Sequence, residues 1–403
     1  MRYDFTTRLD RRGSGSSKWD MMLAKKPDVS PGVIPLSVAD MELPNPPEVV
    51  EGLREFLKTA VLGYTSPTGA YFDAVAHWMR TRHGWEVRRE WIVPAPGVVP
   101  AFFAAVRAFT EPGEGVITMP PVYYPFAMAA TACGRTLVAN PLAYRDGDGG
   151  DGRYHIDFDD LEAKAREPRN KLLLLCSPHN PVGRVWSREE LARVADICGR
   201  NGVLVVSDEI HFDLLMPGVE HTVYATLSAE AEQNCVVCTA PSKTFNLAGM
   251  QASNIVVPNP GLRQRLKDQF MKNAQFTLNI LGQKACEIAY TRCAPWLDAF
   301  LELLRANHGL VRDFFAAHIP QVKAVPLEGT YLQWLDFRAL GLDAAELERF
   351  MVGEAEWFTD EGPMFGAEGG GFERINLACP TAALQEALER LRKALRRRSL
   401  LPR

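Results

Sequence analysis

The chain has 403 residues, of which 47% are hydrophobic and 23% are charged, and its formal net charge is -4. This length and composition indicate a globular protein with one large domain and a smaller companion, and they exclude disordered and fibrous classes. No apolar run approaches the roughly 20 residues that span a bilayer. The net charge does not show the excess of basic residues that is typical of nucleic-acid-binding domains. We therefore expect neither a membrane nor a nucleic acid as partner.

The first twenty residues, MRYDFTTRLDRRGSGSSKWD, carry charges but no apolar core of a signal peptide. A cytoplasmic location is therefore expected. The eight cysteines are scattered along the chain, which suits a reducing compartment better than a disulfide framework. Cys235 and Cys238 form a CxxC pair, but residues three apart in a strand point to opposite faces, so no metal site is expected.

Between about residue 90 and residue 285, short apolar runs alternate with helix-length segments. This alternation predicts an α/β fold, in which helices flank a mostly parallel sheet. The strand-like runs lie at 91–93, 115–119, 136–139, 171–177, 202–207, 235–239 and 253–257.

The segment 97–109 shows helical spacing, with Val99, Phe102, Phe103 and Val106 on one stripe. Its first backbone amides, those of Val98 and Val99, and the positive end of the helix dipole could hold a phosphate group. The alternative is an ordinary helix start without a ligand.

Polar segments follow three of the apolar runs: SPHNPVGRVW (177–186), SDEIHFDL (207–214) and APSKTFNLAGM (240–250). In an open α/β sheet the ligand site lies outside the carboxyl ends of the strands. Asn180, Asp208 and Lys243 are therefore expected to converge.

Lys243 is the leading candidate for a covalent role. A lysine at the end of a buried strand is partly desolvated, which favours its neutral amine and suits it to Schiff-base formation with an aldehyde. Pyridoxal phosphate carries such an aldehyde. A surface lysine that merely follows a strand is the alternative reading of this residue alone.

Beyond residue 285 the pattern changes to long amphipathic segments and two strand-like stretches, 328–337 and 369–380, typical of a smaller α+β domain. We expect residues 46–285 to form the large domain, and residues 1–45 and 286–403 to form the small one. The basic tail 390–403 is expected to be a C-terminal helix, and the segment 147–152 an exposed loop.

Taken together, the motifs resemble those of fold-type I pyridoxal-phosphate enzymes, the aspartate aminotransferase superfamily. The chain is more similar still to the MalY/PatB-like carbon–sulfur lyases within that superfamily. The motifs run in order along nearly the whole chain: RRGSGSSKWD (11–20), LSVADMELPNPPEV (36–49), LGYTSPTG (62–69), PPVYYPF (120–126), SPHNPVGRVW, SDEIHFDL, APSKTFNLAGMQAS (240–253), EGTYLQW (328–334) and FERINLACP (372–380).

The resemblance implies a catalytic role for Lys243, which would hold the cofactor and shuttle protons at the substrate Cα. Asp208 would pair with the pyridine nitrogen and keep it protonated. Asn180 would donate to the phenolic oxygen of the cofactor and contact the substrate, with plain turn formation as its alternative role. His211 falls where many relatives carry a tyrosine facing that oxygen, and a structural role is its alternative.

Tyr123 matches the aromatic residue that stacks on the cofactor ring and takes part in catalysis, with Tyr124 as the rival for that position. The hydroxyl of Ser242 and the amides of Val98 and Val99 would bind the phosphate.

Tyr64 matches a tyrosine that reaches the phosphate and the substrate from the partner subunit, which implies a homodimer with shared active sites. Arg374 matches the arginine that binds the substrate α-carboxylate. At position 251 this chain has a glutamine, whereas many aminotransferases have an arginine there that binds the phosphate. This difference weakens a plain aminotransferase assignment and fits the lyase branch.

The implied activity is β-elimination from an L-cysteine thioether, such as cystathionine or another S-conjugate, which yields a thiol, pyruvate and ammonia. Transamination, decarboxylation or oxidative deamination would use the same residues and stays an alternative. A third possibility is a non-catalytic relative that acts as a binding or regulatory protein. The natural substrate does not follow from the sequence.

Overall fold

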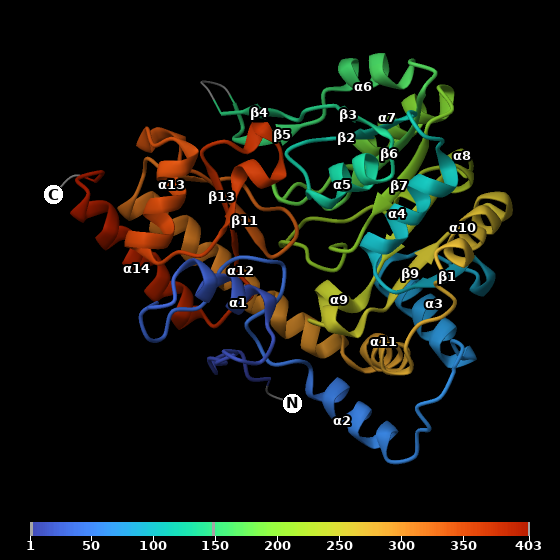
Figure 1. Ribbon diagram of the computed structural model, residues 1–403, viewed down its shortest axis with the longest axis horizontal. Coiled ribbons are helices and arrows are strands. Elements are labelled where there is room, and N and C mark those ends of the chain that lie inside the picture. Colours follow the sequence, from blue (N-terminus) through green and yellow to red (C-terminus); the bar gives the residue numbers. More distant parts are fainter. Residues whose placement is uncertain (1–2, 147–149, 402–403) are drawn as a thin grey trace.

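The computed structural model describes residues 3–146 and 150–401. A seven-stranded sheet with the order β1-β9-β8-β7-β6-β2-β3 forms its larger part (Figure 1). Its strands are β1 (Ile92–Ala95), β2 (Gly115–Thr118), β3 (Thr136–Ala139), β6 (Asn170–Cys176), β7 (Leu204–Asp208), β8 (Cys235–Thr239) and β9 (Ser253–Val256). Strand β9 is antiparallel to both of its neighbours, and the other adjacent strands pair in parallel. The predicted mostly parallel α/β sheet is confirmed.

Apolar side chains on both faces explain why the central strands are buried. In β6, Leu173 and Leu175 pack into one hydrophobic cluster, and Leu172 and Leu174 pack into the other. This alternation is the period of two that a strand imposes. In β8 the same geometry separates the CxxC pair, because its two sulfurs belong to different clusters.

Helices cover both faces of the large sheet. One cluster contains residues of α4 (Val98–Phe109), α5 (Pro125–Ala132) and α10 (Pro260–Lys272). The other contains residues of α3 (Gly69–His83), α6 (Phe158–Ala165), α7 (Arg188–Arg200), α8 (Ala229–Gln233) and α11 (Ile280–Arg292). The predicted helix at 97–109 is α4.

A smaller antiparallel sheet, with the order β10-β11-β13-β12, lies on the other side of the molecule (Figure 1). Its strands are β10 (Lys323–Ala324), β11 (Leu332–Asp336), β12 (Asp360–Glu361) and β13 (Phe372–Asn376). The helices α1 (Ser17–Lys25), α12 (Ala294–His318), α13 (Ala344–Phe350) and α14 (Thr381–Arg397) lie near it, and β4 (Ala143–Arg145) pairs with β5 (Arg153–His155). The two predicted strand stretches are β11 and β13.

The N-terminal segment lies against this small sheet. The backbone of Leu36 donates to the Phe358 carbonyl at 2.8 Å and accepts from the Asn376 amide at 2.8 Å, and the Glu42 amide donates to the Ala378 carbonyl at 2.9 Å. Helix α2 (Pro47–Leu57), which follows, packs on α11 of the large part. The division of the chain at residues 45 and 285 stays a prediction, and residue 285 lies inside α11.

Two sequence-based expectations fall partly outside the described residues. Of the loop expected at 147–152, residues 147–149 are not described, and the predicted C-terminal helix is α14, which ends at Arg397, while residues 402–403 are not described. Within 3–146 and 150–401, no helix is both long and apolar enough to cross a membrane.

Candidate active site

A cavity lies at the carboxyl ends of the central strands. Asp208 at the end of β7, Asn180 in the loop after β6, and Lys243 in the short helix α9 (Pro241–Thr244) after β8 all line it. The predicted site residues Val98, Val99, Tyr123, His211 and Ser242 line the same cavity. The fold therefore brings together side chains that lie up to 145 residues apart, between Val98 and Lys243.

The amino end of α4 forms one wall of the cavity. Gly97, the residue before the helix, has φ 142°, which only glycine adopts without strain, and an added Cβ would come within 3.1 Å of the Pro100 ring. The amides of Val98 and Val99 belong to the first turn, so they have no acceptor within the helix. Together with the Ser242 hydroxyl and the positive end of the helix dipole, they suit an anion such as a phosphate.

Asp208 places a carboxyl group in this cavity, and no cation among the described residues lies at hydrogen-bond distance from it. One of its oxygens accepts from the Ile210 amide at 3.2 Å. Burial raises the pKa of Asp208 to about 7. A ligand with a protonated ring nitrogen would stabilise the charged form of this carboxylate.

The Lys243 amine donates to the carbonyl of Ala39 at 2.7 Å. Burial and, after it, the nearby charge of Arg374 lower the pKa of Lys243 to about 8. A substantial share of the amine is therefore unprotonated at mildly alkaline pH, which is the form that attacks carbonyl carbons and accepts protons.

Arg374 reaches the site from β13 of the small sheet. Its Nη1 donates to the Asn180 side-chain oxygen at 2.6 Å, and its Nη2 binds the carboxylate of Asp360. Asp360 also accepts from the Val38 amide at 2.8 Å. Nε of Arg374 is buried and has no hydrogen-bond partner among the described residues. A fixed guanidinium that keeps one N–H donor without a partner is suited to binding a carboxylate ligand.

The other predicted site residues differ in how they lie relative to the cavity. Tyr123 lines the cavity and its amide donates to the Asn180 carbonyl at 3.0 Å, whereas the rival Tyr124 is 42% exposed and does not line it. Burial holds the pKa of His211 well below its usual range, so its imidazole is neutral, and it meets Tyr331 edge to face. Tyr64 is fully exposed and lies outside the cavity of its own chain.

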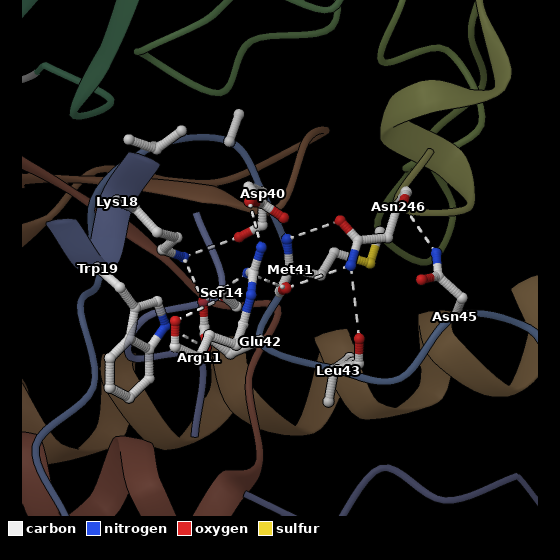
Figure 2. A network of polar contacts seen from close by, with 12 residues as sticks. Arg11, Ser14, Lys18, Trp19, Asp40, Met41, Glu42, Leu43, Asn45 and Asn246 are labelled. Carbon is white, nitrogen blue, oxygen red and sulfur yellow. Dashed lines mark hydrogen bonds and ion pairs between the residues drawn. The ribbon is translucent and has the colours of Figure 1, made fainter. Parts of the chain in front are cut away.

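A network of polar contacts holds the segment next to Lys243 (Figure 2). The carboxylate of Glu42 accepts from Trp19 Nε1 at 2.9 Å and from Arg11 at 3.0 Å, and it pairs with Lys18 at 3.3 Å. On the other side, the amide of Met41 donates to the Asn246 side chain at 3.1 Å. These contacts tie the N-terminal segment to the loop that follows the lysine.

Residues 31–391 match the family model described as aminotransferase class I and II. The chain belongs to this family. Cystathionine beta-lyase PatB of Bacillus subtilis is 42% identical to it over 395 residues, which cover 97% of this chain and 100% of that protein. Protein MalY of Escherichia coli is 30% identical over 396 residues, which cover 98% of this chain and 99% of that protein.

Comparison with solved structures supports the same family assignment. Cystalysin from Treponema denticola, whose crystal structure contains a pyridoxal 5'-phosphate cofactor, superposes with a TM-score of 0.96 at 49% identity, covering 98% of this chain and 100% of that one. A C-S lyase from Staphylococcus hominis superposes with a TM-score of 0.89 at 30% identity, covering 98% of each chain. The predicted superfamily, its fold and its MalY/PatB-like branch are confirmed.

Three contacts at the site of this family member were not predicted. They are the Ala39 carbonyl that accepts from Lys243, the Tyr331 hydroxyl that donates to the same carbonyl at 3.1 Å, and Asp360 beside Arg374. Ala39 and Tyr331 lie in motifs that carried the resemblance, 36–49 and 328–334. No motif contains Asp360, which reaches the site because it pairs opposite Arg374 across β12 and β13.

Replacing Asp208 with Asn is expected to stabilise the ligand-free protein at alkaline pH. The pKa of Asp208 is about 7 in the folded protein against an ordinary value of 3.8, so the folded state binds more protons between these values and loses stability as the pH rises. Compared with the wild type, the free energy of unfolding of the variant should be nearly equal at pH 4 and about 1 to 4 kcal/mol higher at pH 8.

Urea unfolding at the two pH values measures this difference. The exposed Asp20→Asn is the control and should change stability by less than about 0.5 kcal/mol at either pH. If Asp208→Asn changed the free energy of unfolding by the same amount at pH 4 and pH 8, the raised pKa of the buried Asp208 carboxyl would be contradicted.

Proposed function

We propose that the chain is a pyridoxal-phosphate-dependent carbon–sulfur β-lyase. It would convert an L-cysteine thioether and water into a thiol, pyruvate and ammonia. The observation that carries this proposal is the single cavity in which a buried carboxylate, a lysine of lowered pKa and the amino end of α4 meet. Relatives with the name cystathionine beta-lyase and a cofactor-containing structure at 49% identity support it.

The residues of the cavity fit pyridoxal phosphate group by group. The amides of Val98 and Val99 and the Ser242 hydroxyl would hold the phosphate, and Tyr123 would cover the ring with its own. Asp208 would bind the ring nitrogen, which accounts for a buried carboxyl that has no cation at hydrogen-bond distance within 3–146 and 150–401.

The phenolic side of the ring would face Asn180 and His211. Asn180 can donate through its amide nitrogen because its side-chain oxygen already accepts from Arg374. His211 is neutral and its Nδ1 has no partner among the described residues, so one ring nitrogen is available to a ligand oxygen.

When bound, pyridoxal phosphate supplies an electron sink for the charge that develops at the substrate Cα. Lys243 would take the proton from Cα, and the thiolate would then leave Cβ with the electrons of the broken C–S bond. The lowered pKa of Lys243 favours the free amine that this step needs. The carbonyl of Ala39 holds that amine in place when it is not bonded to the cofactor.

Arg374 would bind the substrate α-carboxylate and so fix the orientation of the Cα–H bond. Its guanidinium is pre-positioned by Asn180 and Asp360, which leaves the buried Nε for the ligand. Positioning of this kind lowers the entropic part of the barrier.

Transamination is the competing chemistry, because it needs Lys243, Asp208 and Arg374 as well. Gln251, which lines the cavity at the position eight residues after the lysine, favours the lyase assignment, since many aminotransferases use an arginine there. More distant relatives include an arginine–pyruvate transaminase of Pseudomonas aeruginosa, at 26% identity.

A cytoplasmic homodimer with shared active sites belongs to this proposal. Tyr64 is fully exposed, and the nearby Val61 and Leu62 are 82% and 64% exposed. A second copy that covers this apolar stretch would bury it and could bring Tyr64 to the phosphate side of the neighbouring cavity.

The protein loaded with pyridoxal phosphate should release thiol and pyruvate in equal amounts from S-methylcysteine or cystathionine. Free thiol and pyruvate are followed together with the visible spectrum. Accumulation of pyridoxamine phosphate without thiol would replace the lyase proposal by transamination. A protein that binds no cofactor at all would favour a non-catalytic role.

Replacing Arg374 with Lys should lower kcat/KM about 10- to 150-fold, mainly through a higher KM. The lysine has no equivalent of the Nε–H donor, and a hydrogen bond between charged groups is worth about 1.5 to 3 kcal/mol. Steady-state kinetics with S-methylcysteine measure the change. Arg338→Lys, the same substitution at an ion pair with Asp336 on the small sheet, should leave kcat/KM within about twofold. An unchanged kcat/KM for Arg374→Lys would exclude Arg374 as the carboxylate ligand.

A further inference from the structure

A buried carboxylate lies behind Lys243. It belongs to Asp213, which stands five residues after the end of β7 and whose side chain is fully buried. One of its oxygens accepts from the Thr244 hydroxyl at 2.7 Å, and Thr244 directly follows Lys243 in α9. The other oxygen accepts from Trp78 Nε1 at 3.1 Å and lies 2.9 Å from His83 Nε2. A single carboxylate therefore joins the neighbour of the lysine to helix α3.

Helix α9 is too short to hold Lys243 by its own hydrogen bonds. It contains four residues, and the bond that closes it runs from the Phe245 amide to the Pro241 carbonyl at 2.9 Å. A helix of this length is not stable by itself, so contacts with the rest of the chain must fix its orientation. The hydroxyl of the buried Thr244 supplies such a contact next to the lysine.

The other partners of Asp213 belong to a well-packed part of the core. Trp78 and His83 lie on α3, and α3 packs on α11 (Figure 1). The Trp78 ring stacks on Tyr290 of α11 with a centroid distance of 5.1 Å, and the His83 ring stacks on Phe212 with a centroid distance of 3.9 Å. The position of Asp213 is therefore fixed by α3 as well as by its own loop.

The turn after β7 directs its polar side chains to two sides. Asp208 and His211 line the cofactor cavity. Glu209 and Asp213 are buried carboxylates that each meet a histidine, and Glu209 lies 2.8 Å from His221 Nε2. The turn that places the expected partner of the ring nitrogen is thus held from behind at two points, and Asp213 extends this support to α9.

We propose that Asp213 is a positioning residue that holds Lys243, through Thr244, in the place where it bonds to the cofactor. The inference rests on the proposed use of pyridoxal phosphate. For stability alone, well-packed apolar residues often replace a buried carboxylate and its partners without loss. Here the carboxylate connects the turn that carries Asp208 to the helix that carries Lys243, so it fixes the groups at the two ends of the cofactor relative to each other.

Thr244→Val tests this role, because it removes the hydroxyl and keeps the shape of the side chain. Binding of two compounds to the cofactor-free protein is measured by equilibrium dialysis. The aldehyde of pyridoxal phosphate condenses with a lysine amine to a C=N bond and releases water, whereas pyridoxamine phosphate fills the same cavity and has no aldehyde. Thr244→Val should raise the Kd of pyridoxal phosphate about tenfold and leave the Kd of pyridoxamine phosphate within about twofold of the wild type.

Three further variants complete the comparison. Thr244→Ser keeps the hydroxyl and should retain the wild-type Kd for both compounds. Thr239→Val is the matched control, because Thr239 is equally buried and donates one hydrogen bond, to the Asn254 carbonyl at 3.0 Å. It should leave both Kd values within about twofold of the wild type. Asp213→Asn removes the charge at the other end of the bond and should reproduce the selective loss, so it decides the outcome if Thr244→Val does not fold.

An unchanged Kd for pyridoxal phosphate in Thr244→Val, or equal losses for the two compounds, would overturn the positioning role while the lyase function stands. A loss in Thr244→Ser as large as that in Thr244→Val would overturn it as well, because the hydroxyl would then not be the group that matters. A wild-type protein that binds both compounds but releases no thiol from S-methylcysteine would contradict the lyase function, and the binding comparison would still decide the role of Asp213.

Discussion

The hydrogen bond between Arg374 and Asn180 joins the two sheets at the site. Asn180 follows β6 of the large sheet, and Arg374 lies on β13 of the small sheet. The two residues are 3% and 4% exposed, respectively. Asp360 extends the connection, because its carboxylate binds Arg374 and the amide of Val38. Loss of either member of the ion pair between Arg374 and Asp360 would leave a buried charge without its partner, which is among the most costly changes in a protein. The substrate-binding arginine is therefore placed by the same contacts that connect the two halves of the molecule.

Burial shifts the pKa values of several groups at the site in the direction that favours their neutral forms. Burial raises the pKa of Asp208 to about 7 and lowers the pKa of Lys243 to about 8, and it lowers the pKa of His211 as well. Such groups reduce the stability of the free protein and become favourable when a ligand supplies their partners. The two hydrophobic clusters that pack against the faces of the large sheet offset this cost. The cofactor is accordingly expected to stabilise the folded state as well as to react.

The central part of the site could be predicted from the sequence because its residues follow apolar strands. Asn180, Asp208 and Lys243 each stand just after or at the end of such a run, and parallel strands present these ends at one edge. Arg374 was placed only by resemblance, since nothing in a strand of the small sheet indicates that it faces Asn180. The pairing of Asp360 with Arg374, and the contacts of Glu42 with residues about 23 to 31 positions earlier, depend on tertiary packing. Local patterns do not encode those contacts. The reversed direction of β9 was likewise not visible in its apolar run.

The most direct test locates the cofactor on the chain. The protein is loaded with pyridoxal phosphate, reduced with borohydride so that the cofactor becomes fixed to its lysine, digested, and mapped by mass spectrometry. We predict the pyridoxyl group on the peptide that contains Lys243 and not on the peptide of Lys18, a buried lysine that lines a neighbouring cavity together with Lys243. A label on Lys18 or another lysine, or no label at all, would contradict the site and the function built on it.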